Sequence, residues 1–337
     1  MKKLFSLFLV SLICFVADAQ DKPFLTKKFN ASQIKALEVN TSGGGITVMG
    51  SNASEAVVEV YIKGSTGKTL SRSEIEDRLE DYTLEIKRDG NTLICFAKNN
   101  EKWSWKSGLT ITFKIYSPVN VDTELLTSGG GIKMENLKGN LRFSTSGGGL
   151  DLAGLSGEVK GRTSGGGIKI RNSEDNIDLS TSGGGIQADE VAGNVRLSTS
   201  GGGITLKNMY GVIKANTSGG GVHVDNVEGE LNTSTSGGSI HLSGIKGSAK
   251  ATTSGGSIHA DIDQVGDYLV LHSSGGGISV QMPFNKGMNV DIKGDRVTMH
   301  DYKNFNGSFE KDHIRGTVNG GGADVKISSS SGNVSIN

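Results

Sequence analysis

Apolar residues recur with a fixed period of 18 through the middle of this 337-residue chain. The motif Thr-Ser-Gly-Gly-Gly-Ile begins at Thr127 and returns in recognisable form every 18 residues as far as Thr253. When this Thr is numbered position 1, positions 6 and 8 are apolar in every copy, and positions 15 and 17 in most. Apolar residues two apart lie on the same side of a strand. Each unit therefore predicts two short strands, and the same alternation turns the Thr inward.

The fixed period favours a coil over the main alternative, a meander of hairpins. A helix is excluded because the apolar period is two and each glycine costs about 1 kcal/mol relative to Ala. Hairpins would not need the same residue type every 18 residues, whereas a parallel coil stacks like residues about 4.8 Å apart. We predict an all-β parallel solenoid, or β-helix, whose glycines supply a turn with positive φ and close backbone approach. Parallel crossovers favour right-handed winding, although an 18-residue coil also matches left-handed solenoids.

The period breaks on both sides of the regular units, although the motif recurs at 41–46 and 273–278. A solenoid end exposes strand edges and an open core, so the segment between Thr41 and Thr127 is expected to be a cap. One short helix is predicted over Ser71–Asp81, with Ser71 or Ser73 as its N-cap. Residues 317–337 resume a coil pattern and are expected to close the rod. Alternation predicts cap strands over residues 57–62, 82–87, 92–96 and 109–116.

The first residues have the three regions of a secretory signal peptide: Lys2 and Lys3, an apolar run, and a small-residue cleavage site ending at Ala19. The run is shorter than the ~20 residues that span a bilayer, so we expect export through a cleavable signal, with no spanning segment in the mature chain. The destination is the periplasm, the outer membrane or the exterior. The predicted division is residues 1–19 as signal peptide, 20–126 as first coils plus inserted cap, 127–282 as regular solenoid and 283–337 as irregular closing coils.

Charge and cysteine content narrow the possible partners. The chain has 35 basic and 35 acidic residues, so no bulk attraction to nucleic acid or anionic membrane is expected. Cleavage of the leader would remove Cys14 and leave only Cys95, so an internal disulfide cannot form. Oligomeric state is not indicated by the sequence.

A column of histidines is the first candidate site. Position 7 points outward and holds His223, His241 and His259 in three successive units, with Asp225 and Asp261 two residues further on. Stacked imidazoles beside carboxylates can bind a divalent ion or change charge near neutral pH. A straight ladder, however, does not bring three imidazoles within the ~2.0–2.1 Å that zinc requires. A solvated face inherited by repeat duplication is the favoured interpretation, and no metal is predicted.

A basic strip at position 16 is the second candidate, interrupted by Asp178 and Asn232. It could contact an anionic glycan, but the favoured interpretation is that the charges keep a flat sheet soluble. The strip consists of Arg142, Lys160, Arg196, Lys214 and Lys250.

Trp103 and Trp105 form the third candidate, because an extended segment places both on one side. They could stack on a sugar or a partner. Packing over the end of the solenoid is the favoured alternative.

An enzymatic site is not apparent. Parallel β-helix enzymes that cleave polysaccharides need clustered carboxylates with Arg or Lys on neighbouring coils. Here the acidic residues are scattered, and no column stacks more than two in successive units. We therefore predict no catalytic residue and no cofactor.

The chain resembles a family of Gly-rich bacterial β-solenoid proteins named as adhesins, related to proteins with a head GIN domain. The resemblance rests on the strand Ile111–Tyr116 leading into Pro118, the repeated Thr-Ser-Gly-Gly-Gly-Ile units, and the ending Gly-Thr-Val-Asn-Gly-Gly-Gly-Ala-Asp-Val-Lys-Ile that begins at Gly316. It covers nearly all of the mature chain. It implies the solenoid fold and brings no catalytic residue, while fold-level analogy leaves function open.

Three hypotheses follow. The first is an exported, non-enzymatic envelope protein whose rod serves adhesion or scaffolding, with envelope glycans or surface proteins as partners. The second is a carbohydrate-active β-helix enzyme or glycan-binding protein with an unrecognised site. The third is a metal- or pH-responsive sensor that uses the histidine column.

Overall fold

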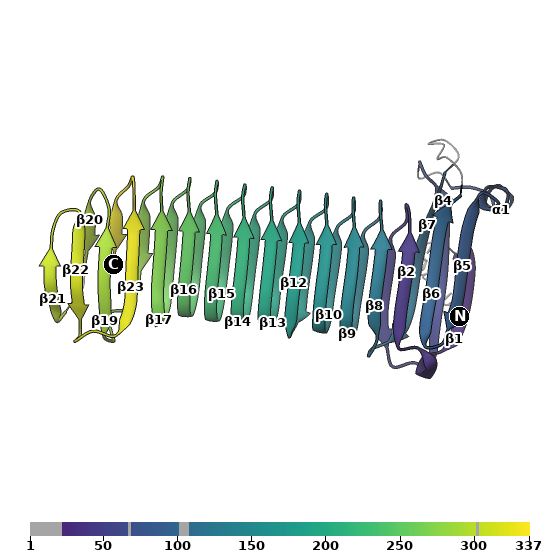
Figure 1. The fold of residues 1–337 in the computed structure, drawn as a ribbon, viewed down its shortest axis with the longest axis horizontal. Coiled ribbons are helices and arrows are strands. Elements are labelled where there is room, and N and C mark those ends of the chain that lie inside the picture. Colours follow the sequence, from purple (N-terminus) through teal and green to yellow (C-terminus); the bar gives the residue numbers. More distant parts are fainter. Residues whose placement is uncertain (1–21, 67–68, 101–107, 301–302) are drawn as a thin grey trace, which may run out of the picture.

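A computed structural model describes residues 22–66, 69–100, 108–300 and 303–337 of the protein. These residues form a long stack of β-strands with one α-helix beside its N-terminal end (Figure 1). Strands of the middle section pair in parallel, each with the strands 18 residues before and after it. The predicted all-β parallel solenoid is confirmed. Its right-handed winding stays a prediction.

Most regular coils contain one long strand rather than the two short strands that the sequence predicts. The ladder continues through the bend of the coil, because Leu137 pairs with Leu155 and Gly139 with Gly157 in the same register as the flanking residues. The 14-residue strands are β9 (Ile132–Thr145), β10 (Leu150–Thr163), β13 (Ile186–Thr199), β14 (Ile204–Thr217), β15 (Val222–Thr235) and β16 (Ile240–Thr253). One coil is divided into β11 (Ile168–Ser173) and β12 (Asn176–Thr181), and β17 (Ile258–Ser273) has 16 residues.

Two backbone positions make the bend, and both have left-handed φ. Position 13 is Gly in most coils, as at Gly211 with φ 108°, where a residue with a Cβ would be strained. Position 10 was not recognised in the sequence. It carries residues that tolerate the left-handed region or have no Cβ, with Glu190 as the exception. Its residues are Asn136, Gly154, Asn172, Glu190, Asn208, Asn226 and Gly244, with φ between 50° and 65°.

The glycines of the repeated motif do not have the positive φ that we predicted. None has a φ in the left-handed region, so that part of the prediction is wrong. Close approach between coils explains them instead: a Cβ on Gly184 would lie 2.3 Å from the carbonyl oxygen of Gly166 in the preceding coil. The fifth position is less crowded, and Ser239 and Ser257 occupy it in two coils. The motif therefore specifies backbone contact between coils.

The Thr of position 1 points inward, as predicted. Thr199 is 5% exposed, and its hydroxyl donates to the carbonyl oxygen of Gly184 at 2.7 Å. The hydroxyl oxygen of Thr199 in turn accepts from the backbone N–H of Gly202 at 3.4 Å. The partners are thus backbone groups of the glycine turns, rather than neighbouring Thr hydroxyls. This side chain links each coil to the one before it.

We expect Thr199→Val to lower the free energy of unfolding by about 1–3 kcal/mol, because the Gly184 carbonyl loses its hydroxyl donor without a large change in shape. Thr199→Ser is the matched control, since Ser273 and Ser329 make the same bond to Gly256 and Gly276. It should cost no more than about 0.8 kcal/mol, the contribution of one buried methyl. Urea unfolding followed by circular dichroism measures both. A loss in Thr199→Val no larger than that in Thr199→Ser would show that the hydroxyl hydrogen bond is not the main contribution.

At the N-terminal end, the first coil in sequence lies inside the stack. It consists of β2 (Ala36–Thr41) and β3 (Ile46–Ser51). On one side they pair with β8 (Asp122–Thr127) and β9, and on the other with β6 (Thr92–Asn99) and β7 (Leu109–Pro118). The outer layer is antiparallel: β5 (Tyr82–Asp89) covers β6, β4 (Glu55–Gly64) covers β7, and β1 (Leu25–Asn30) covers β4.

The four predicted cap strands and the predicted helix are confirmed. The helix α1 spans Arg72–Leu79, and its N-cap is Ser71. Ser71 and Glu74 form a reciprocal capping box, which satisfies backbone donors at the start of the helix. A single turn of 3₁₀-helix, Ala31–Gln33, joins β1 to β2.

At the C-terminal end, the last coil in sequence is also internal. It consists of β23 (Ala323–Ser329) and β24 (Val334–Ile336), which pair with β17 and β18 (Ile278–Gln281). On their other side they pair with β19 (Met288–Lys293) and β20 (Val297–Met299). The antiparallel strands β22 (His313–Val318) and β21 (Phe305–Phe309) lie outermost. The expectation that residues 317–337 close the rod is therefore wrong. Their strands β23 and β24 lie inside the stack, and β22 and β21 cover β19 at its end.

The inward side chains form one continuous apolar core along the stack. Cys95 belongs to this core and is 0% exposed. Burial raises the pKa of its thiol to about 12, so the group stays protonated at neutral pH. Packing and backbone hydrogen bonds therefore hold the described fold together.

Candidate functional site

Two outward faces run along the coils. The histidine face consists of the outward residues at positions 7 and 9, on the first half of each long strand. The arginine face consists of the outward residues at positions 14, 16 and 18, on the second half. Because like positions pair in register, each face repeats along the stack at the coil spacing of about 4.8 Å.

The structure brings the three predicted histidines into one exposed line. His241 pairs in register with His223 on one side and His259 on the other. The ring centroids are 6.3 Å apart for the first pair and 6.2 Å for the second. Of the two predicted aspartates, Asp261 lies 3.7 Å from the Nε2 of His259. Among the described residues, no three His, Cys, Asp or Glu side chains are placed to hold one metal ion.

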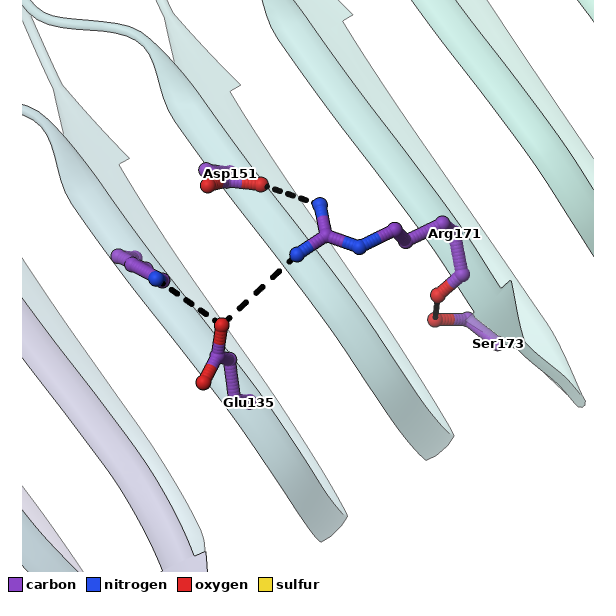
Figure 2. A network of polar contacts seen from close by, with 5 residues as sticks. Glu135, Asp151, Arg171 and Ser173 are labelled. Carbon is purple, nitrogen blue, oxygen red and sulfur yellow. Dashed lines mark hydrogen bonds and ion pairs between the residues drawn. The ribbon is translucent and has the colours of Figure 1, made fainter.

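The other end of the histidine face carries a network of ion pairs that sequence reasoning missed (Figure 2). Arg171 contacts two preceding coils: Nη1 lies 2.8 Å from Asp151 and Nη2 lies 3.8 Å from Glu135. Lys133 Nζ adds a contact of 3.0 Å to Glu135. The signal was present in the sequence, as opposite charges at positions 7 and 9 of successive units. At this exposure such pairs contribute little to stability, but they give Lys133 and Arg171 carboxylate partners.

The predicted basic strip lies on the arginine face, where register places its members in one column. Lys160 pairs with Arg142 on one side and Asp178 on the other, followed by Arg196 and Lys214. Arg162, two residues from Lys160 of the column, points to the same face. The sequence pattern does not single it out, because no other unit has a charged residue at position 18 and Ser is the commonest residue there.

Two adjoining depressions lie along this column. The first, of about 650 Å³, is lined by Arg142, Lys160 and Arg162, with Glu124 and Asp178. The second, of about 210 Å³, shares Lys160 and Asp178 with the first. It continues along the face to Arg196 and Lys214. Together they form an open groove that crosses several coils.

The cations of the arginine face are mostly unpaired. Lys160 is the exception, with its Nζ 2.7 Å from Glu158 on the same strand. Within the described ranges, no ion pair or hydrogen bond involves the side chain of Arg142, Arg162, Arg196, Lys214 or Lys250. This distinguishes them from Arg171 on the histidine face.

Other polar groups serve to connect coils. The hydroxyl of Tyr268 donates to Glu230 at 2.9 Å, which joins β17 to β15 across an intervening strand. Burial, followed by this bond, raises the pKa of Tyr268 to about 12. The third predicted site, Trp103 and Trp105, lies outside the described residues. In the described part of the chain, no helix is long and apolar enough to cross a membrane.

Comparison with known proteins finds a matching family and several similar solved structures. Solved structures that resemble the chain include a candidate lipid-binding protein from Parabacteroides distasonis, at 14% identity and a TM-score of 0.33, covering 94% of this chain and 98% of the other. A candidate adhesin from Bacteroides fragilis matches at 13% identity and a TM-score of 0.28, covering 93% and 96%. A candidate cell adhesion protein from Clostridium sporogenes matches at 10% identity and a TM-score of 0.18, covering 94% and 99%.

A comparison with curated proteins finds no match. The family comparison is more definite, because one family model matches residues 34–337. The match includes the internal first coil, the cap and the last coil as well as the regular repeat. The chain belongs to the Toastrack DUF4097 family.

Proposed function

We propose that the protein is an exported, non-enzymatic envelope protein whose rod presents a side face to surface polymers or surface proteins, as an adhesin or scaffold does. The observation that carries the proposal is the arginine face. Its outward side chains repeat in register over successive coils, and the cations of its basic strip other than Lys160 lack partners in the described structure.

The architecture supports a side face rather than an end as the binding surface. Both ends of the stack are covered by antiparallel strands, which limit the parallel edges open to another chain. The sides are continuous and mostly polar, with Leu126 and Val212 as exposed apolar residues on the arginine face, and their spacing is set by backbone pairing. A polymer that repeats along its own length can meet such a surface at several points at once.

Export and adhesion are tested on the full chain in a bacterial host. We expect the mature protein to begin at Gln20, and surface protease treatment to remove it from intact cells. The purified mature protein should bind members of a glycan array and release no reducing ends from them. A full-length protein that stays in the cytoplasm would contradict export. Release of sugar fragments would overturn the non-enzymatic assignment in favour of a carbohydrate-active β-helix.

A further inference from the structure

We infer that the arginine face binds a linear polysaccharide that carries carboxylate groups, with the chain lying along the rod across successive coils. This inference rests on the proposed function and names its ligand class and its binding face. Three features carry it: the unpaired guanidinium groups, the groove that connects them, and the carboxylates and hydroxyls placed between them.

The guanidinium groups indicate the charge and geometry of the ligand. Arg142, Arg162 and Arg196 have exposed side chains with no partner within the described ranges. A guanidinium offers planar, bidentate donors that match a carboxylate. On the histidine face, by contrast, Lys133 and Arg171 both lie against the carboxylate of Glu135. Leaving the donors unpaired keeps them available to a ligand.

The groove indicates an extended ligand. The two depressions share Lys160 and Asp178, so they connect Arg142 and Arg162 with Arg196 along the stack. Small side chains such as Ser144 and Ser180 lie between the long ones in the first depression. Successive coils are about 4.8 Å apart, a step similar to that of one sugar in an extended chain. A linear polysaccharide can therefore place carboxylate groups near the cations and sugar hydroxyls near Asp178.

The acidic residues distinguish a polysaccharide from a nucleic acid. Glu124 and Asp178 lie beside the cations in the first depression, and Glu158 in the second. A continuous phosphate backbone would be repelled at each of these positions. Sugar hydroxyls can instead donate to the carboxylates while uronate groups meet the arginines. The chain as a whole also has zero formal charge, so the affinity must come from this local pattern.

The test compares two triple variants that remove the same charge. In the first, Arg142→Gln, Arg162→Gln and Arg196→Gln are combined on the arginine face. In the second, Lys133→Gln, Lys169→Gln and Lys207→Gln are combined on the histidine face. All six residues lie on strand surfaces, so circular dichroism should show unchanged folding. Binding of polygalacturonate, dextran and single-stranded DNA is measured by calorimetry at two salt concentrations.

We expect wild-type protein to bind polygalacturonate in preference to dextran and DNA, with an affinity that falls as salt rises. The arginine variant should bind at least about tenfold more weakly, as expected for the loss of charge-assisted hydrogen bonds. The lysine variant should stay within about twofold of wild type. Equal losses in both variants, or tighter binding of DNA at the same face, would overturn the inference. Binding of dextran alone would overturn it while leaving the adhesive function standing.

Discussion

Gly184→Ala is expected to lower the free energy of unfolding by about 3 kcal/mol, the upper range for adding a methyl to a closely packed interior. The new Cβ would lie 2.3 Å from the carbonyl oxygen of Gly166 and 2.4 Å from the backbone nitrogen of Gly167. The turn that holds both atoms cannot move away freely, because Gly166 O accepts from the Thr181 hydroxyl at 2.7 Å and Gly167 O from the Leu150 N–H at 3.0 Å. Thermal and urea unfolding, followed by circular dichroism, measure the change.

Gly185→Ala is the matched control, because it makes the same chemical change one residue later. Its Cβ would lie 3.0 Å from the carbonyl oxygen of Gly203, and Ser occupies the equivalent position in two other coils. Neither glycine has a left-handed φ, so backbone strain is similar in the two variants. We expect a change within about 1 kcal/mol. Equal destabilisation by both substitutions would show that close approach between coils does not explain the motif.

Removal of residues 323–337 is expected to have the largest effect, because it deletes an internal layer of the stack. Val325, Ile327, Val334 and Ile336 are each 0% exposed, and burial of such side chains contributes about 1.5–3 kcal/mol each. Deletion would also take away the partners of β19 and β20. We expect rapid proteolysis between β18 and β19 and a loss of solubility. Limited proteolysis and size-exclusion chromatography measure both.

A pair of point substitutions tests the same conclusion in case the truncated chain does not fold at all. Ile327→Asp places a charge in the core, whereas Lys326→Asp changes a residue whose side chain is 63% exposed. Only the first should destabilise the C-terminal end. If truncation leaves melting temperature and protease pattern unchanged, β23 and β24 do not act as an internal layer.

Local pattern was sufficient to predict most elements but not their order in the stack. Alternation predicted the cap strands, and the two candidate N-caps Ser71 and Ser73 marked the start of the helix to within two residues. The local sequence of β2 does not indicate that this strand lies between β6 and β8, because its alternating pattern is compatible with pairing to either one. That choice depends on which strand edges remain free once the whole chain has folded.

The candidate sites were predictable in proportion to how strictly they follow the repeat. The histidine column and the position-16 cations were visible because like residues stack. Arg162 was missed because it departs from the usual Ser of its position, and the Arg171 network was missed because its partners lie on diagonal rather than equivalent positions. The φ of the motif glycines was wrongly predicted because two different requirements select Gly: close approach of another backbone and a left-handed φ. The sequence is the same in both cases, and only the three-dimensional structure distinguishes them.

The placement of the first and last coils inside the stack has a consequence for how such a rod can change its length. Each of these coils is held on both faces, and the layers outside them come from segments inserted between coils, with β1 added at the N-terminal end. Repeats added before β2 or after β24 would have no open surface on which to stack. Duplication of a unit between β9 and β16 would meet matching surfaces above and below. The rod can therefore grow from its middle while both of its ends stay unchanged.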